Sequence, residues 1–491
     1  MSRCAYDLGN RGRASLFTIE QRPKVTPMPP PDTTSYRSLS LWHDTLPAGD
    51  QLEQRASLPG DIDVDVAIVG AGYTGMWTAH YLREADPTLR IVIIERDIAG
   101  FGASGRNGGW ASALLPMGLD TIAKSHGRDE ATRIQRAMFA SIDEIGRVTQ
   151  ELGIDCGFAK GGTLTMVRNP AQAPRIHADL RHKASYGLTD DIWLDRTEIA
   201  ERTSATDLLG ASFTPHCAAL HPARLARGLA ASLVARGVTI YEGTTVSSIE
   251  PHCVRTDHGT VKADIVVRAT EGFTPTLKGL RRTVVPIYSL MLCTEPLSDD
   301  TWSSIGLRDR ETFTDGRHSV IYGQRTADGR LAFGGRAAPY HFGSAISAEF
   351  ERPRAVHEMI HATLVKIYPQ VADAAITHQW GGPLGATRDW QCGVGLDKSS
   401  GLAWAGGYVG DGVTTTNLAG RTLADLIGGR STDLTSLAWV GHSSRQWEPE
   451  PLRWVAIRAA LLLAASADNS ETRRQRPERA RAWVIDKLTG H

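Results

Sequence analysis

Several features that would assign this chain of 491 residues to other classes of protein are missing from its sequence. Its six cysteines are widely separated and none forms a Cys-x-x-Cys pair, so neither a zinc knuckle nor a dithiol redox motif is indicated. The formal net charge is zero, which gives no electrostatic reason to expect a nucleic-acid partner. No run of about 18 apolar residues occurs, and the N-terminus has no apolar signal-peptide core. These absences favour a globular protein of the cytoplasm, with reduced thiols and no membrane partner.

Residues 64–95 hold the pattern of a dinucleotide-binding unit. A short run of β-branched and apolar residues, 64–69, predicts a buried strand, and Gly-Ala-Gly-Tyr-Thr-Gly follows at 70–75. A helical stretch and a second apolar strand come next, and the second strand ends on Glu95. The motif Gly-x-Gly-x-x-Gly is weak evidence alone, but here the strand, the helix and the acid all stand where dinucleotide binding requires them.

Each residue of this unit has a physical role in holding a dinucleotide. Gly70 allows the tight turn, Gly72 lets a pyrophosphate approach the backbone, and Gly75 lets helix and strand pack closely. The helix start offers unpaired N–H groups to the phosphates, and Glu95 would accept hydrogen bonds from ribose hydroxyls. The alternative is an α/β turn that binds nothing. The candidate residues are Gly70, Gly72, Tyr73, Thr74, Gly75, Glu95 and Arg96.

A second glycine-rich loop at 100–109, Gly-Phe-Gly-Ala-Ser-Gly-Arg-Asn-Gly-Gly, follows directly. A domain for NAD would normally continue into another helix here, whereas so open a backbone suits the approach of a second part of a longer ligand. Its side chains can reach a phosphate or the edge of a flavin ring. The bland alternative is a flexible surface loop. The candidates are Gly102, Ala103, Ser104, Arg106, Asn107, Gly108 and Gly109.

These two motifs together resemble the N-terminal part of the FAD-dependent amine and amino-acid oxidases of the D-amino-acid oxidase superfamily, and among these the γ-glutamylputrescine oxidase-like proteins. A third glycine-rich motif, in which a strand, a turn and a helix follow one another at 402–427, resembles the C-terminal flavin motif of that family. The resemblance implies that a helix N-terminus faces the isoalloxazine there, where its dipole stabilises reduced flavin. It adds Val246 near the adenosine end, Thr270 and Gly272 beside the dinucleotide, and Gly410, Gly412 and Val413 at the third motif as candidate cofactor-binding residues.

The expected fold class is α/β, α+β overall: a Rossmann-like FAD-binding domain with a discontinuous mixed-sheet substrate domain. The FAD-binding domain would comprise residues 60–155, 216–280 and 395–430, and the substrate domain residues 156–215 and 281–394. Residues 1–37 carry charges and a proline run without periodicity and are expected to be a disordered arm. Residues 431–491 are expected to be a C-terminal helical extension.

The resemblance implies oxidation of a C–N bond in a small amine or amino acid. Hydride would pass to flavin N5, water would hydrolyse the imine, and O2 or another acceptor would reoxidise the flavin. No side chain need act as an indispensable base, because the flavin carries the chemistry. His341, Tyr288 and Tyr322 are candidates for polarising the amine, and Arg336 and Arg388 are candidate anchors for a substrate carboxylate.

Three other readings of the sequence stay open to different degrees. An NAD(P)-linked dehydrogenase would use the first fingerprint but would not need the second and third glycine-rich motifs. A non-catalytic flavin-binding protein would have all three motifs. Residues 357–361 spell His-Glu-x-x-His, the pattern of a zinc protease, but the helix at 349–368 already has an apolar core face and no third ligand is suggested nearby. We therefore expect no metal.

Overall fold

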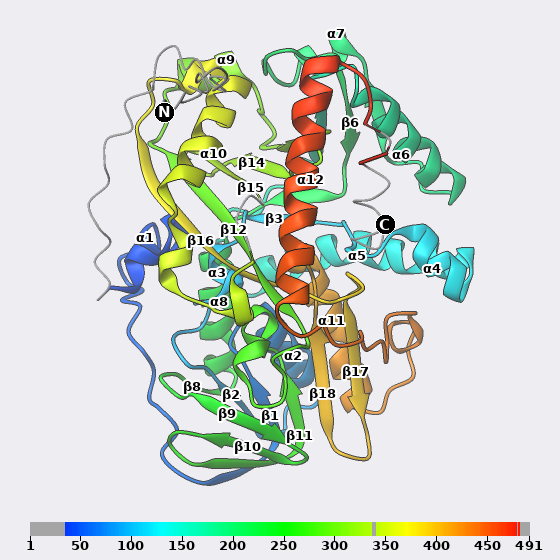
Figure 1. Ribbon diagram of the computed structural model, residues 1–491. Coiled ribbons are helices and arrows are strands. Elements are labelled where there is room, and N and C mark those ends of the chain that lie inside the picture. Colours follow the sequence, from blue (N-terminus) through cyan, green and yellow to red (C-terminus); the bar gives the residue numbers. More distant parts are fainter. Residues whose placement is uncertain (1–34, 336–339, 479, 482–491) are drawn as a thin grey trace, which may run out of the picture.

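The computed structural model describes residues 35–335, 340–478 and 480–481, which form two lobes, each built around a large β-sheet (Figure 1). The chain passes between the sheets repeatedly. Strands β1 and β2 lie in the first sheet, β4 to β6 in the second, β8 to β11 in the first, β12 to β16 in the second, and β17 and β18 in the first again. The predicted fold class, a Rossmann-like domain with a discontinuous mixed-sheet second domain, is confirmed.

The first sheet is parallel at its centre, in the order β17-β18-β11-β1-β2-β8. Its strands are β1 (Ile62–Val69), β2 (Ile91–Ile94), β8 (Thr239–Tyr241), β9 (Val246–Glu250), β10 (Cys253–Thr256), β11 (Thr260–Arg268), β17 (Gly393–Asp397) and β18 (Leu402–Gly406). All four residues of β2 and the last four of β1 are buried, as expected for parallel strands covered on both faces.

Helices pack against this sheet, which forms the lower part of the molecule in Figure 1. Helix α2 contacts both α8 and α11, and α11 also contacts α5. Their apolar faces join the central strands in one core, to which the long amphipathic α5 contributes a buried stripe at three- and four-residue spacing. The bounds are α2 (Tyr73–Ala85), α3 (Ala103–Arg106), α4 (Leu119–His126), α5 (Arg128–Glu151), α8 (Pro222–Ala235) and α11 (Gly412–Ile427).

The second sheet is mixed and has the order β16-β12-β15-β14-β13-β4-β6-β5, in which β13 and β4 are parallel neighbours. Its strands are β4 (Thr163–Val167), β5 (Ile192–Leu194), β6 (Gly210–Thr214), β12 (Val285–Thr294), β13 (Thr312–Asp315), β14 (Ile321–Arg325), β15 (Leu331–Gly335) and β16 (Ile376–Ala386). A short pair, β3 (Trp110–Ser112) with β7 (Cys217–Ala219), is separate from both sheets. The remaining helices of this lobe are α6 (Ala173–Ser185), α7 (Arg196–Ala200), α9 (Asp299–Ile305) and α10 (Arg354–Ile367).

The two faces of the second sheet have different neighbours. Tyr288 and Leu290 of β12 belong to the core that includes Ile360 of α10. Met291, on the opposite face, packs in a cluster with Trp42, which lies against the glycine-rich loop after β2. Since side chains alternate across a strand, β12 presents one face to α10 and the other to the first lobe.

The His-Glu-x-x-His pattern lies in α10, where it serves packing. His357 is buried, and its Nε2 lies 3.1 Å from the carbonyl oxygen of Met291 on the neighbouring strand. His361 is buried as well. The motif is thus part of the helix–sheet interface of the second lobe.

The N-terminal segment begins with η1 (Tyr36–Leu39) and α1 (Leu41–Asp44). Residues 36 and 37, which the sequence assigns to a disordered arm, belong to η1. Arg37 fixes this turn, because its guanidinium donates to several main-chain carbonyls, including that of Asp50 at 2.7 Å. The rest of the predicted arm, residues 1–34, lies outside the described residues.

Towards the other end of the chain, α12 (Leu452–Arg474) runs along the upper lobe in Figure 1, with its first turns near the level of α11. Its last turns are attached through Glu471, whose carboxylate accepts hydrogen bonds from Arg175 at 2.9 and 3.1 Å. Fewer of its residues are buried than in α2 or α11, and Leu462 is 72% exposed. Among the helices of the described residues, none is long and apolar enough to cross a membrane.

Candidate cofactor and active site

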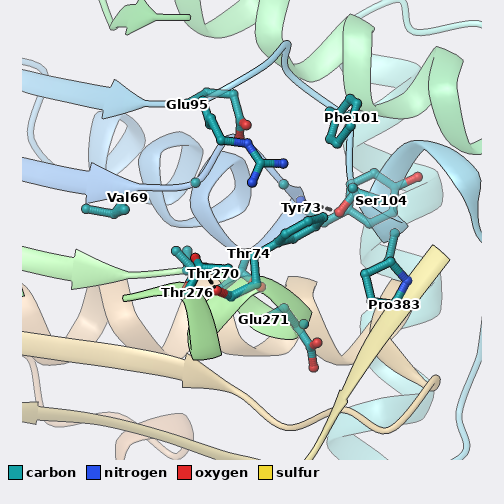
Figure 2. A pocket seen from close by; sticks show the side chains of 18 of the residues that line it. Val69, Tyr73, Thr74, Glu95, Phe101, Ser104, Thr270, Glu271, Thr276 and Pro383 are labelled. Carbon is teal, nitrogen blue, oxygen red and sulfur yellow. Dashed lines mark hydrogen bonds between the residues drawn. The ribbon is translucent and has the colours of Figure 1, made fainter. Parts of the chain in front are cut away.

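A cavity of about 480 Å³ lies at the carboxyl ends of β1, β2 and β11 (Figure 2). It reaches from Glu95 and Val246 at one end to Pro383 and Val413 at the other. The carboxyl edge of a parallel sheet is where α/β folds bind their ligands. All three glycine-rich motifs singled out in the sequence contribute to its wall.

The first motif turns tightly between β1 and α2. Gly70 has a φ of +107°, and a Cβ there would lie 2.7 Å from the carbonyl oxygen of Ala269, directly after β11. A Cβ on Gly75 would lie 2.1 Å from the carbonyl oxygen of Gly70. Gly72 stands at the start of α2 and makes no side-chain cap, so the first turn of the helix presents backbone N–H groups at the cavity. This is the geometry that binds a phosphate.

The side chains of Glu95 and Arg96 line the end of the cavity nearest β2. Glu95 accepts hydrogen bonds from the backbone N–H groups of Ala71 at 2.8 Å and Asp97 at 3.0 Å. Its burial raises the pKa of this carboxyl to about 6. Arg96 lines the cavity with its guanidinium carbon 5.0 Å from the ring centroid of Phe273.

The second motif folds around α3 and one asparagine. The Asn107 amide donates to the carbonyls of Ala103 at 3.1 Å and Ser104 at 3.0 Å, while its oxygen accepts from the N–H of Gly109 at 2.7 Å. The Ser104 hydroxyl accepts from the N–H of Tyr73 at 2.8 Å, which joins the second loop to the first (Figure 2). The two loops therefore form one continuous wall.

The third motif completes the opposite end of the cavity. Gly410, Gly412 and Val413 line it at the start of α11, as do Thr270 and Gly272 after β11. The hydroxyls of Thr74 and Tyr408 lie 3.0 Å apart and connect α2 to this segment. Asp411 occupies the N-cap position of α11, but its side chain makes no capping hydrogen bond there. The α11 N–H groups thus remain directed at the cavity end.

Comparison with known proteins assigns this geometry. The family model DAO, described as FAD dependent oxidoreductase, matches residues 65–426. The chain belongs to the DAO family of FAD-dependent oxidoreductases. The assignment of FAD as cofactor and of the chain as an enzyme, both expected from the sequence, is confirmed.

Similar proteins agree with this family. Gamma-glutamylputrescine oxidoreductase of Escherichia coli (strain K12) is 30% identical over 392 residues, which cover 79% of this chain and 88% of that protein. Probable oxidoreductase OrdL of Rhizobium meliloti (strain 1021) is 31% identical over 392 residues, covering 77% of this chain and 86% of that protein. The crystal structure of glycine oxidase from Geobacillus kaustophilus superposes with a TM-score of 0.65 at 22% identity, covering 77% of this chain and 99% of that one.

The described residues fit FAD. The cavity's glycines leave room where a Cβ would collide, and at neither α2 nor α11 does the N-cap residue make a side-chain capping hydrogen bond. Glu95 and Val246 stand at the end suited to adenosine, α2 beside the position for pyrophosphate, and α11 at the end suited to isoalloxazine.

Arg106 has a different position from its neighbours in the second motif. Its side chain is buried and reaches into the second lobe, where Nη1 lies 2.7 Å from Glu351 Oε2. Its Nε and Nη2 have no hydrogen-bond partner within the described part of the chain. Arg106 thus links the second glycine-rich loop, residues 100–109 and hereafter the FAD loop, to the second lobe instead of lining the cavity wall. Its assignment to cofactor binding therefore stays a prediction.

The resemblance places the turn at 270–272 near the dinucleotide but assigns no role to Glu271 within it, whose side chain lines the cavity between Thr270 and Gly272. Its carboxylate accepts from the N–H of Gly385 at 2.6 Å and the N–H of Tyr408 at 3.1 Å. These donors lie 114 and 137 residues further along the chain. No local pattern therefore marked it.

The candidate substrate residues do not converge on one point. The Tyr322 ring packs on the FAD loop, since a Cβ on Gly108 would lie 2.8 Å from it, and its hydroxyl lies 2.6 Å from that of Ser289. Tyr288 belongs to the opposite face of the sheet, where its hydroxyl accepts from the N–H of Ser347 at 3.1 Å. His341 is near Tyr288 and stacks on a phenylalanine. Of these three candidate residues, Tyr322 lies beside the FAD loop.

Of the two candidate anchors for a substrate carboxylate, Arg388 is already engaged in an ion pair. Arg388 is paired with Glu448, with Nε 2.9 Å from Oε2, and stacks over Trp447. Binding a substrate carboxylate there would require this ion pair to open. Arg336 lies outside the described residues.

Proposed function

We propose that this enzyme oxidises a C–N bond of a small amine or amino acid. The observation that carries the proposal is the cavity lined by three glycine-rich segments, which the N-termini of α2 and α11 and the side chains of Glu95 and Glu271 also border. The 30% identity to a gamma-glutamylputrescine oxidoreductase over most of the chain supports an amine as donor. When bound, FAD accepts a hydride from the substrate carbon at N5, and the resulting imine is hydrolysed by water.

The protein's own part is to bind, orient and shield. The N–H groups of α2 would hold the pyrophosphate, Glu95 would hold the ribose, and the dipole of α11 would favour negative charge at the other end of the bound FAD. We assign the sheet of β1, β2, β8 to β11, β17 and β18 to the FAD-binding lobe, corresponding to segments 60–155, 216–280 and 395–430. The other sheet, in segments 156–215 and 281–394, forms the substrate lobe.

The substrate site is proposed on the face of the second sheet that meets the loop at 107–109. Tyr322 and Ser289 lie on this face and supply a hydrogen-bonded pair of hydroxyls next to that loop. These two hydroxyls can accept a hydrogen bond from a neutral amine or donate one to it. Because Arg388 is engaged by Glu448, an amine without an α-carboxylate suits the described residues better than an amino acid does. O2 as acceptor and a cytoplasmic location belong to the same proposal.

The deciding experiment is an absorption spectrum of the purified protein, followed by anaerobic addition of a panel of amines and amino acids. We expect flavin bands that one class of amine bleaches, and air should restore them if O2 is the acceptor. Flavin that no donor bleaches would favour a non-catalytic flavin-binding protein. Protein that takes up NAD(P) and cannot be reconstituted with FAD would overturn the proposal.

A further inference from the structure

Glu271 occupies the wall between two cavities. It lines the isoalloxazine end of the FAD cavity, and it also lines a smaller cavity of about 50 Å³ behind it, together with Arg268. Its backbone has a φ of +37°, a conformation that a non-glycine residue rarely adopts. Such a conformation persists where the surroundings hold it, and at functional sites in particular.

Backbone N–H groups from distant segments hold the carboxylate. Gly385 of β16 and Tyr408 of the loop before α11 each donate to one oxygen, at 2.6 and 3.1 Å. A Cβ on Gly385 would lie 2.5 Å from the nearer carboxylate oxygen, so this approach requires glycine. Glu271 therefore joins η2 (Glu271–Thr276), the second sheet and the third flavin segment at one end of the cavity. All these partners are donors, which suits an ionised carboxylate better than an amide.

Few other charges face this carboxylate. Burial raises the pKa of Glu271 to about 7, while the backbone N–H groups lower it. Burial lowers the pKa of the Arg268 guanidinium, which the charge of Glu271 counteracts. Burial also raises the pKa of Tyr408 and of Cys392, so both remain neutral near pH 7. The other ionisable groups that line the larger cavity are Glu95, Arg96, Lys278 and Tyr73. The smaller cavity is lined by His442, whose Nε2 lies 3.0 Å from Asp389 Oδ2, and Asp411 stands at the start of α11.

We propose that Glu271 positions the isoalloxazine end of FAD and takes up a proton when the flavin is reduced. The inference rests on the proposed function, because reduction by an amine is the event that changes the charge beside the carboxylate. Two electrons and one proton convert oxidised flavin to its anionic reduced form. The new negative charge favours protonation of the neighbouring carboxylate, so a second proton is taken from solvent onto Glu271. Two protons then accompany two electrons.

The midpoint potential of the bound flavin measures this directly. One proton for two electrons changes the equilibrium tenfold per pH unit, or about 30 mV, and two protons change it a hundredfold, or about 59 mV. We expect the holoenzyme, titrated anaerobically with dithionite and a redox dye, to show the steeper dependence above about pH 7, where Glu271 is ionised beside oxidised flavin. Below that pH, Glu271 is protonated in both redox states and the slope should be the shallower one. Glu271→Gln should show the shallower dependence throughout. A wild-type slope of about 30 mV above that pH, or a steep slope retained by Glu271→Gln, would overturn the inference.

Glu95→Gln is the matched control, because Glu95 is also held by two backbone N–H groups but lies at the adenosine end. It should weaken FAD binding about tenfold or more and keep the wild-type slope. Glu271→Asp should keep the steep slope with weaker FAD binding. If Glu271→Gln does not retain FAD, the wild-type slope decides alone. Amine bleaching with a 30 mV slope would leave the proposed function standing and remove the role of Glu271.

Discussion

At the scale of single residues, the distance from an added Cβ to its neighbours shows which positions of the FAD site require glycine. Gly75 is the clearest case, since a Cβ there would lie 2.1 Å from the carbonyl oxygen of Gly70. Gly75 belongs to α2, yet its Cα faces the turn that precedes the helix, and the obstacle there is backbone. A flexible side chain can move aside at little cost, whereas the Gly70 carbonyl can move only with β1. Substitution at this position therefore tests whether the close approach of α2 to β1 is what creates the site.

Gly75→Ala should reduce FAD affinity at least tenfold and destabilise the protein by about 1–3 kcal/mol. The added Cβ would lie 2.1 Å from Gly70 O and 3.0 Å from Ile68 Cγ2, so α2 must shift and its first N–H groups no longer face the pyrophosphate. FAD retention after gel filtration and a fluorescence titration measure the loss. Gly118→Ala is the control, since a Cβ there meets nothing within 4 Å. Equal FAD content in the two variants would contradict the argument.

At the scale of elements, the sequence predicted what is encoded locally. The first and third motifs are contiguous units of strand, glycine-rich turn and helix, and the second is a contiguous loop of ten residues, so their residue spacing indicated both structure and ligand. The partners of Glu271 and Arg106 were not predictable, because they come from strands and turns more than 100 residues away. Tyr288 and Tyr322 show the same limit: alternation says that they lie on one of two faces, but only the packing of α10 shows which face is which.

The docking of α1 is an element-scale property that should depend on pH. His43 of α1 is buried, with Nδ1 2.9 Å from Ser40 Oγ, and His221 at the start of α8 has Nε2 3.0 Å from Thr45 Oγ1. Burial lowers the pKa of each ring to about 3. When α1 is undocked, both imidazoles are exposed and bind protons from about pH 6.5 downward, whereas in the docked state they do not. Docking of α1 is therefore fully stable above about pH 6.5 and weakens below it.

We expect the segment to lose about 1.4 kcal/mol of docking free energy per histidine per pH unit between pH 6.5 and 3. Trp42 fluorescence reports it, because its Nε1 donates to the carbonyl of Asn107 at 2.9 Å in the FAD loop. His221→Asn should retain the helix cap and show a shallower pH dependence. An unchanged pH dependence in this variant would exclude His221 from the transition.

At the scale of the whole molecule, the two lobes meet through the FAD loop. Gln324 of β14 donates to the carbonyl of Gly108 at 2.6 Å, and Arg106 crosses the boundary in the same region to reach Glu351. A buried ion pair contributes little net stability, because both groups lose hydration, but removing one partner leaves the other unpaired. The pair is therefore better explained as fixing how the lobes fit together than as a source of stability.

Glu351→Gln should lower the free energy of unfolding by about 3–5 kcal/mol, since it leaves the Arg106 guanidinium buried without a counter-charge. Glu351 and Arg106 side chains are 13% and 2% exposed, so water cannot replace the lost partner. The double variant Arg106→Met with Glu351→Leu should recover most of this stability. Thermal unfolding of the wild type, Arg106→Met, Glu351→Leu and this double variant closes a double-mutant cycle. If the pair fixes the fit of the lobes, the stable double variant will still show weaker FAD retention and slower bleaching by amine than the wild type. Full retention of both properties would mean that the apolar contacts of Trp42 and Trp380 align the lobes without the ion pair.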